Sequence, residues 1–181
     1  LVFWWARSMW GDAAGVGALA LFAFSPTTLA HGPLVTSDMC AAVCLLAALA
    51  AWWRLSLSPR PKLVLLAGVT TGLAFVAKFS AVLLLPVFVA LLGLRVGTAA
   101  KADRASLSKK LAAASVLAGV ITWALIWSFF GFRFNAADPA VAPFAHFYQP
   151  WHVLLANGGG WTIAVRWARE VHALPEAFLY G

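Results

Sequence analysis

The segment HGPLVTSD, residues 31–38, places an imidazole and a carboxylate between two long apolar stretches. Its Gly-Pro pair predicts a turn, and Thr36 or Ser37 can cap a following helix. Asp38 then falls in the first turn of that helix, where the helix dipole stabilises a carboxylate. One interpretation is structural, with Asp38 as capping chemistry and His31 as an interfacial polar residue. The other is that His31 and Asp38 line a substrate cavity just outside a bilayer, where ionisable groups are costly and usually have a function.

Two basic residues are predicted to lie at the same depth relative to the bilayer as Asp38. Lys78 interrupts the apolar residues 63–94, and Arg133 follows the last long apolar run. Lys78 could pair with Asp38 or snorkel to the headgroup region. Lys78 and Arg133 could also hold the phosphate of a lipid-linked donor, because charge-assisted hydrogen bonds to phosphate oxygens are strong.

The composition requires a membrane setting for these residues. The chain is 63% hydrophobic and 10% charged, with a mean hydropathy of +0.87, far from the values of soluble domains. The charged residues divide it into segments that predict an all-α, multi-span helical bundle. Residues 63–94 are predicted to form a helix pair that turns at Lys78, with Pro86 inside the second helix. The predicted spans are residues 13–30, 37–54, 63–78, 79–95 and 111–130.

The basic residues predict the orientation of these spans through the positive-inside rule. Nine would face the cytoplasm: Arg7, Arg54, Arg60, Lys62, Arg95, Lys101, Arg104, Lys109 and Lys110. Four would lie outside: Lys78, Arg133, Arg166 and Arg169. The segment HGPLVTSD is then extracytoplasmic. The net charge of +7 is explained by topology, and because no basic stripe with interleaved aromatic residues appears, no nucleic-acid partner is predicted.

Two regions are predicted: a transmembrane region over residues 1–132, with about five spans and the end of an earlier one, and an extracytoplasmic loop region over residues 133–181. In the loop region, residues 161–172 predict a helix with an apolar and a polar face. The apolar face comprises Trp161, Ala164, Val165, Trp167, Ala168 and Val171, and the polar face Thr162, Arg166, Arg169 and Glu170. Such a helix either lies in the membrane surface or packs on the protein's own outer domain.

The loop histidines do not predict a metal site. His146, His152 and His172 lack the one-face spacing of a metal-binding pair. We expect surface histidines, no metal ligands and no defined cofactor, with a divalent metal left open.

Three groups of residues in a fixed order carry a resemblance to a known family: SP, AHG and TSD within residues 25–38, then AG, TGLA and KFS within residues 67–80, and LPE and FLYG at residues 174–181. They resemble the protein O-mannosyltransferase and aminoarabinose-transferase type of polyprenyl-phosphate-sugar glycosyltransferases. The resemblance implies a GT-C fold that takes a sugar, such as mannose, from a dolichyl- or undecaprenyl-phosphate carrier. The acceptor would be a protein or lipid group on the outer side of the membrane, and the enzyme a multi-pass protein of a bacterial plasma membrane.

The resemblance also implies roles for individual residues. Transfer in that family inverts the anomeric centre, with an aspartate in the first outer loop as general base. We expect this chain to begin after that loop, so it is predicted to contain no catalytic residue and to be inactive alone. Asp38 matches the family's cavity-lining outer-loop aspartate, and Lys78 its lysine at the outer end of a span. Two other classes stay open: part of a transporter or flippase, and a non-catalytic membrane assembly subunit.

Overall fold

The computed structural model describes residues 1–32, 37–136, 150–156 and 159–180, and the regular elements in this part of the chain are all helices. Packing divides the chain into unit 1, Leu1–Thr122, and unit 2, Trp123–Gly181. The helical architecture, with helices apolar enough to cross a membrane, confirms the predicted fold class. The predicted division at residue 132 separates membrane from outer regions and stays a prediction.

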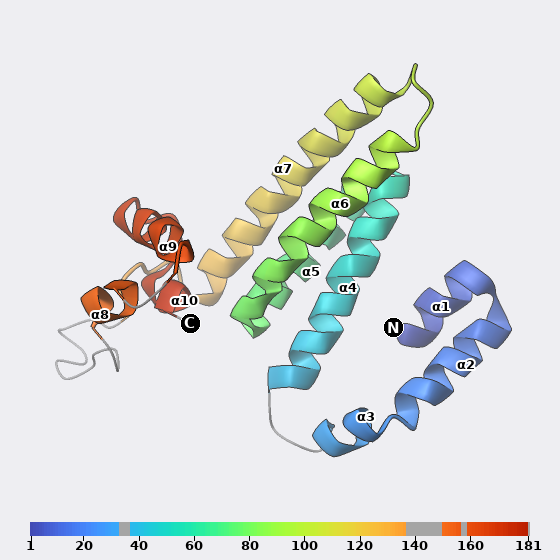
Figure 1. Ribbon diagram of the computed structural model, residues 1–181, viewed down its shortest axis with the longest axis horizontal. Coiled ribbons are helices and arrows are strands. Elements are labelled where there is room, and N and C mark those ends of the chain that lie inside the picture. Colours follow the sequence, from blue (N-terminus) through green and yellow to red (C-terminus); the bar gives the residue numbers. More distant parts are fainter. Residues whose placement is uncertain (33–36, 137–149, 157–158, 181) are drawn as a thin grey trace. The chain divides into compact units, whose positions relative to one another are not determined.

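Unit 1 begins with a hairpin of two helices, α1 (Val2–Trp10) and α2 (Asp12–Ala23) (Figure 1). Gly11 makes the turn with a φ of 85°, a conformation that glycine adopts without strain. The two helices approach closely at Gly15, where a Cβ atom would lie 3.0 Å from Cβ of Arg7. Arg7 also forms an ion pair with Asp12 across the turn, at 2.5 Å.

The predicted span over residues 13–30 is wrong as a single helix. The chain leaves the helical conformation after Ala23 and resumes it in α3 (Pro26–His31). Ser25 is extended, with φ −64° and ψ 125°, as expected for a residue that precedes proline. Pro26 has no N–H to donate to the preceding turn, but it fits the first position of a new helix.

The remaining helices of unit 1 agree closely with the predicted spans. They are α4 (Ser37–Leu57), α5 (Pro61–Ala77), the 3₁₀ helix η1 (Phe79–Leu83), α6 (Leu84–Gly97) and α7 (Arg104–Phe129), which ends in unit 2. Figure 1 shows α4, α5 and α6 side by side. The predicted turn at Lys78 is confirmed, because this residue is extended between α5 and η1. Pro86 lies in the first turn of α6, inside the apolar stretch Phe79–Gly97, at a position where a missing N–H is tolerated.

Small and aromatic side chains form the core of unit 1. The indole of Trp52 stacks on Phe88 with ring centroids 4.5 Å apart, and its Nε1 donates a 2.9 Å hydrogen bond to Oγ1 of buried Thr71. Gly68 brings α5 against α7, because a Cβ atom there would lie 2.7 Å from Cβ of Ile121. The buried cluster comprises Ala48, Ala51, Trp52, Leu55, Val64, Ala67, Phe88, Ala114 and Ala118.

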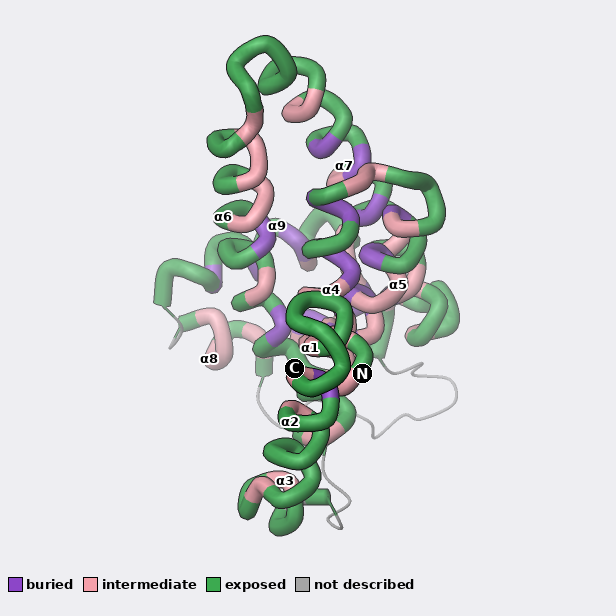
Figure 2. Tube along the Cα trace, turned by 90° about the vertical axis from the view of Figure 1, so that its right-hand side faces the viewer, coloured by how far each residue is buried: buried purple, intermediate pink, exposed green. Residues whose placement is uncertain are grey.

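The outer surface of these helices is apolar, which suits a lipid environment. Three helices are long and apolar enough to cross a membrane: Ser37–Leu57, Phe79–Gly97 and Arg104–Phe129. Two of the predicted spans correspond to shorter apolar helices, α2 and α5. Figure 2 shows exposed stretches interrupting the buried ones along the helices. Side chains such as Leu21, 78% exposed, and Val89, 72% exposed, would be unfavourable in water and favourable against acyl chains.

Unit 2 contains the end of α7 and three short helices, α8 (Trp151–Ala156), α9 (Trp161–Glu170) and α10 (Glu176–Tyr180). The indoles of Trp123 and Trp127 both donate hydrogen bonds to the carbonyl of Ala173, at 2.7 and 3.2 Å. These bonds tie the segment after α9 to the end of α7.

Helix α9 forms where the sequence predicts it, but the predicted faces are partly wrong. Val165 and Ala168 pack on Leu179, as the alternative of packing on the protein's own outer domain requires. Thr162, assigned to the polar face, is buried, and its hydroxyl is satisfied by the carbonyl of Gly159 at 2.9 Å. Trp161, Trp167 and Val171, assigned to the apolar face, do not pack inside the protein, and their side chains are exposed.

Candidate functional site

The candidate site in unit 1 is built from the ends of two helices. Asp38 is the second residue of α4, where the unpaired N–H groups of the first turn favour a carboxylate. Lys78 follows the last residue of α5. Its backbone N–H donates to Ala74 and its carbonyl accepts the N–H of Ala81, both at 3.0 Å. The end of α5 and the start of η1 therefore fix the position from which the lysine side chain extends.

The side chains of Asp38 and Lys78 meet in an ion pair. Nζ of Lys78 donates to Oδ1 of Asp38 at 2.5 Å. The two side chains are 51% and 47% exposed, so solvent and solutes reach both charges. A half-exposed ammonium has donor capacity beyond one contact, because it carries three N–H groups. The pair can therefore present a positive hydrogen-bond donor to an anionic group while Asp38 holds the lysine in place.

The other two residues predicted for the site are His31 and Arg133. His31 is the last residue of α3, and its side chain lies outside the described part of the chain. Arg133 belongs to unit 2 and follows a tight turn in which Gly131 and Phe132 have φ values of 61° and 57°. It lines a pocket of about 350 Å³ together with Asn135 and other residues of that turn. Arg133 forms no ion pair with the residues that the structure describes.

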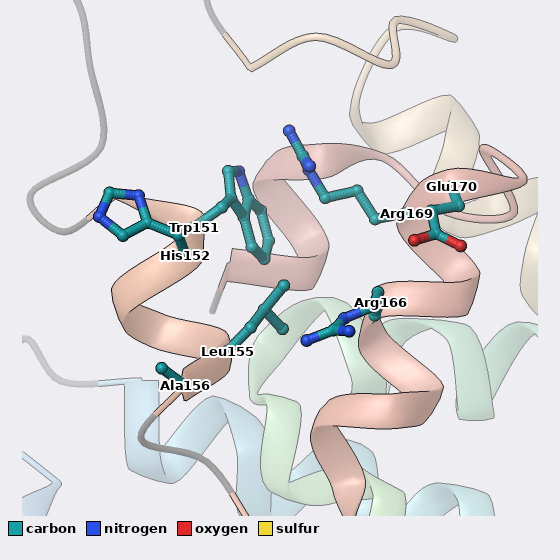
Figure 3. Close-up of a pocket in the computed structure, with 7 residues that line it drawn as sticks. All are labelled: Trp151, His152, Leu155, Ala156, Arg166, Arg169 and Glu170. Carbon is teal, nitrogen blue, oxygen red and sulfur yellow. The ribbon is translucent and has the colours of Figure 1, made fainter.

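A second pocket lies within unit 2, between α8 and α9, with a volume of about 570 Å³. Figure 3 shows Arg166 extending from α9 toward Leu155 on α8, while the imidazole of His152 turns away from the other side chains. The guanidinium of Arg169 stacks on the Trp151 ring at 4.9 Å. Arg166 makes no ion pair within the described ranges, so it is the cation of this pocket that can meet an anionic ligand.

Glu176 holds this pocket together, a role that no sequence pattern predicted. Its Oε1 accepts hydrogen bonds from Nε1 of Trp151 at 2.8 Å and from Nε and Nη2 of Arg169 at 3.2 and 3.1 Å. Its backbone N–H donates to Phe134 at 2.9 Å. Only 13% of its side chain is exposed. The available signal was a carboxylate directly after Pro175 in an otherwise apolar stretch, which predicts a buried or capping role.

The histidines are separated in the described part of the chain. His152 lies on α8, and His172 packs edge-on against Phe134, with ring centroids 3.9 Å apart. His146 lies outside the described residues. Among residues 1–32, 37–136, 150–156 and 159–180, no group of three His, Cys, Asp or Glu side chains is arranged to hold a metal ion.

Comparison with known proteins gives one match. The family described as dolichyl-phosphate-mannose-protein mannosyltransferase matches residues 1–107. This range contains Asp38 and Lys78 and ends before Arg133 and the pocket of unit 2. No curated protein and no solved structure matches the chain significantly.

Proposed function

The chain belongs to the dolichyl-phosphate-mannose-protein mannosyltransferase family, and from this we propose that it helps to transfer a sugar from a polyprenyl-phosphate carrier to an acceptor outside the membrane. The sugar is mannose or a related hexose or pentose, and the acceptor is a hydroxyl or phosphate of a protein or lipid. The membrane is a bacterial plasma membrane, with the end of unit 1 that carries Asp38 and Lys78 facing outward.

The ion pair between Lys78 and Asp38 is the observation that carries this proposal. A polyprenyl-phosphate sugar has a phosphate at the level where its lipid chain leaves the bilayer, and transfer of the sugar leaves negative charge on that phosphate. A lysine ammonium at a helix end can stabilise this charge in the transition state. Lys78 lies within the segment that matches the family, at the end of an apolar helix, and it is half exposed.

We assign Lys78 to the carrier phosphate and Asp38 to positioning of Lys78 and to the wall of the substrate cavity. Because Lys78 engages the carboxylate of Asp38, Asp38 is poorly placed to accept a proton from an acceptor hydroxyl. We therefore propose that the general base is supplied by another part of the protein. Arg133 is proposed as a second phosphate ligand and His31 as a residue of the cavity.

The test compares sugar transfer by purified full-length variants in detergent, with a synthetic polyprenyl-phosphate mannose as donor. Lys78→Ala should lower turnover about ten- to a hundred-fold, the effect of losing one charge-assisted contact. Lys78→Arg should recover only part, because its forked guanidinium presents charge differently. Lys62→Ala removes the same side chain at the opposite end of α5 and should leave turnover unchanged.

The double variant Asp38→Asn/Lys78→Ala separates two roles of the lysine. If Lys78 only neutralises Asp38, removing both charges restores turnover. If Lys78 binds the phosphate, turnover in the double variant stays as low as in Lys78→Ala. Wild-type turnover in a correctly folded Lys78→Ala protein would remove Lys78 from the site. If the folded wild-type protein transferred sugar to no acceptor, a function in transport or as a non-catalytic assembly subunit would be favoured instead.

A further inference from the structure

A pocket at the opposite end of unit 1 has the donors expected of an anion site. It has a volume of about 450 Å³ and lies between the end of α6, the connection to α7 and the first turns of α7. The residues that supply polar groups to its wall are Arg95, Thr98, Asp103, Ser106 and Lys110. We propose that this pocket binds the phosphodiester headgroup of an anionic phospholipid. The inference goes beyond the transferase function and does not depend on it.

The pocket lies in the most basic part of unit 1. The end of α6 adjoins the end of α4, because Nε of Arg95 donates to the carbonyl of Ser56 at 3.3 Å. The helix ends and connections at this end carry eight cations: Arg54, Arg60, Lys62, Arg95, Lys101, Arg104, Lys109 and Lys110. Asp103 is the one acidic residue in this same set of segments. Such an excess of positive charge attracts the anionic headgroups of a membrane surface.

Arg104 holds the backbone around the pocket in place but does not line the pocket. Its Nε donates to the carbonyl of Ala99 at 3.0 Å and its Nη2 to that of Gly97 at 2.6 Å. These bonds satisfy carbonyls at and just beyond the end of α6 and close the connection to α7. The backbone around the pocket is therefore held by a side chain that does not line it.

The donors that line the pocket are available to a ligand. Arg95 uses Nε for Ser56, which leaves the terminal N–H groups of its guanidinium. Lys110 and the hydroxyl of Ser106 have no hydrogen-bond or ion-pair partner among the described residues. Three donors from two helices around one cavity match the several acceptor oxygens of a phosphodiester.

The surface beside the pocket favours a lipid over free phosphate. Leu94, directly before Arg95, is 69% exposed, and Val89 lies further along the same helix with 72% exposure. The helix from Phe79 to Gly97 is long and apolar enough to span a bilayer. A molecule with a phosphodiester in the pocket can therefore lay its acyl chains along the outer surface of α6. Inorganic phosphate would use the cations and gain nothing from this apolar surface.

The experiment measures lipid binding to the purified full-length protein by native mass spectrometry in a mild detergent. The probes are dioleoyl-phosphatidylglycerol, dioleoyl-phosphatidylcholine and inorganic phosphate. The wild type should bind phosphatidylglycerol at least about tenfold more tightly than phosphatidylcholine, which carries the same phosphodiester but adds a choline ammonium that the cations of the pocket repel. Inorganic phosphate in large excess should not displace the bound phosphatidylglycerol. If inorganic phosphate displaced phosphatidylglycerol at concentrations comparable to that of the lipid, the pocket would be a site for a free anion and the proposal would be wrong.

Matched variants distinguish a pocket from a diffuse basic surface. Lys110→Ala should weaken phosphatidylglycerol binding about tenfold, and Ser106→Ala should weaken it several-fold. Lys109→Ala removes the same charge from the neighbouring position, which does not line the pocket, and should change binding less than twofold. Asp103→Asn should strengthen binding, because it removes the one carboxylate beside the phosphate. Equal losses of phosphatidylglycerol affinity in Lys109→Ala and Lys110→Ala would refute binding in the pocket. An unfolding temperature equal to that of the wild type shows that each variant is folded.

Discussion

Lys78 and Asp38 are forty residues apart in sequence, yet Nζ of the lysine lies 2.5 Å from Oδ1 of the aspartate. The contact joins the position after α5 to the first turn of α4. Among the described side chains of the residues predicted for the site, this is the contact that brings two of them together. Its energetic role can be separated from any role in catalysis.

The ion pair should contribute little to stability. Both side chains are about half exposed, and such surface pairs typically contribute about 0–1 kcal/mol. We expect Asp38→Asn and Lys78→Ala each to change the free energy of unfolding by less than about 1 kcal/mol. Denaturant unfolding in detergent, followed through the tryptophan fluorescence, checks this. A loss of several kcal/mol would mean that the pair holds α4 against α5, and the activity of Lys78→Ala would then report folding.

Gly68→Ala should destabilise the packing of α5 on α7. The added methyl group would lie 2.7 Å from Cβ of Ile121 and 2.8 Å from the carbonyl oxygen of Ala118. Overpacking of this kind costs about 1–3 kcal/mol. A fall in the thermal unfolding temperature of the purified protein would show it.

Gly93→Ala on α6 is the matched control for Gly68→Ala, because nothing lies within 4 Å of a Cβ atom there. It should be neutral or stabilising by up to about 1 kcal/mol through helix propensity. Equal unfolding temperatures for the two variants would contradict the close approach of α5 and α7.

Glu176→Gln should loosen unit 2. The carboxylate accepts from Trp151 and Arg169 and is only 13% exposed, so its loss leaves the guanidinium without its charge partner. We expect a loss of about 1–3 kcal/mol, seen as faster proteolysis of the segment from α8 to α10. Glu170→Gln makes the same chemical change at an exposed position of α9 and should leave proteolysis unchanged. Similar protection in both variants would remove Glu176 from its organising role.

The proposed orientation can be tested by cysteine labelling. In a Cys40→Ala/Cys44→Ala background, Ser37→Cys should react with a membrane-impermeant maleimide applied to intact cells. Ala102→Cys, in the connection between α6 and α7, should react only after the membrane is permeabilised, because the positive-inside rule places that connection in the cytoplasm. The reverse labelling pattern would overturn both the orientation and the outward-facing site.

Much of unit 1 was predictable because charge and hydropathy report directly on where apolar helices end. The turn at Lys78 was predicted without any glycine or proline, from the requirement that two basic groups lie on one side of the membrane. The prediction of one span over residues 13–30 failed because its hydropathy is uniform while Pro26 interrupts its hydrogen bonding. Hydropathy alone does not distinguish a continuous apolar helix from two apolar helices separated by a break.

Unit 2 was less predictable because its contacts depend on tertiary structure. Which face of α9 is buried depends on where Leu179, from α10, packs against Val165 and Ala168. The partners of Glu176 are 7 and 25 residues away. Helical periodicity describes one helix at a time and carries no information about such contacts.

The break after α2 has a consequence for the bilayer around it. A helix of 12 residues is about 18 Å long, well short of the about 30 Å of a hydrocarbon core. Tilting would shorten the reach of such a helix further, so α2 could span a bilayer only where the hydrocarbon is thinner than usual. Thinning there would place Ser25 and the backbone groups around Pro26 at the water interface, where water can satisfy them. For the proposed transferase, a lipid-linked sugar beside such a thinned region would have less hydrocarbon to cross than one beside the longer helix α7.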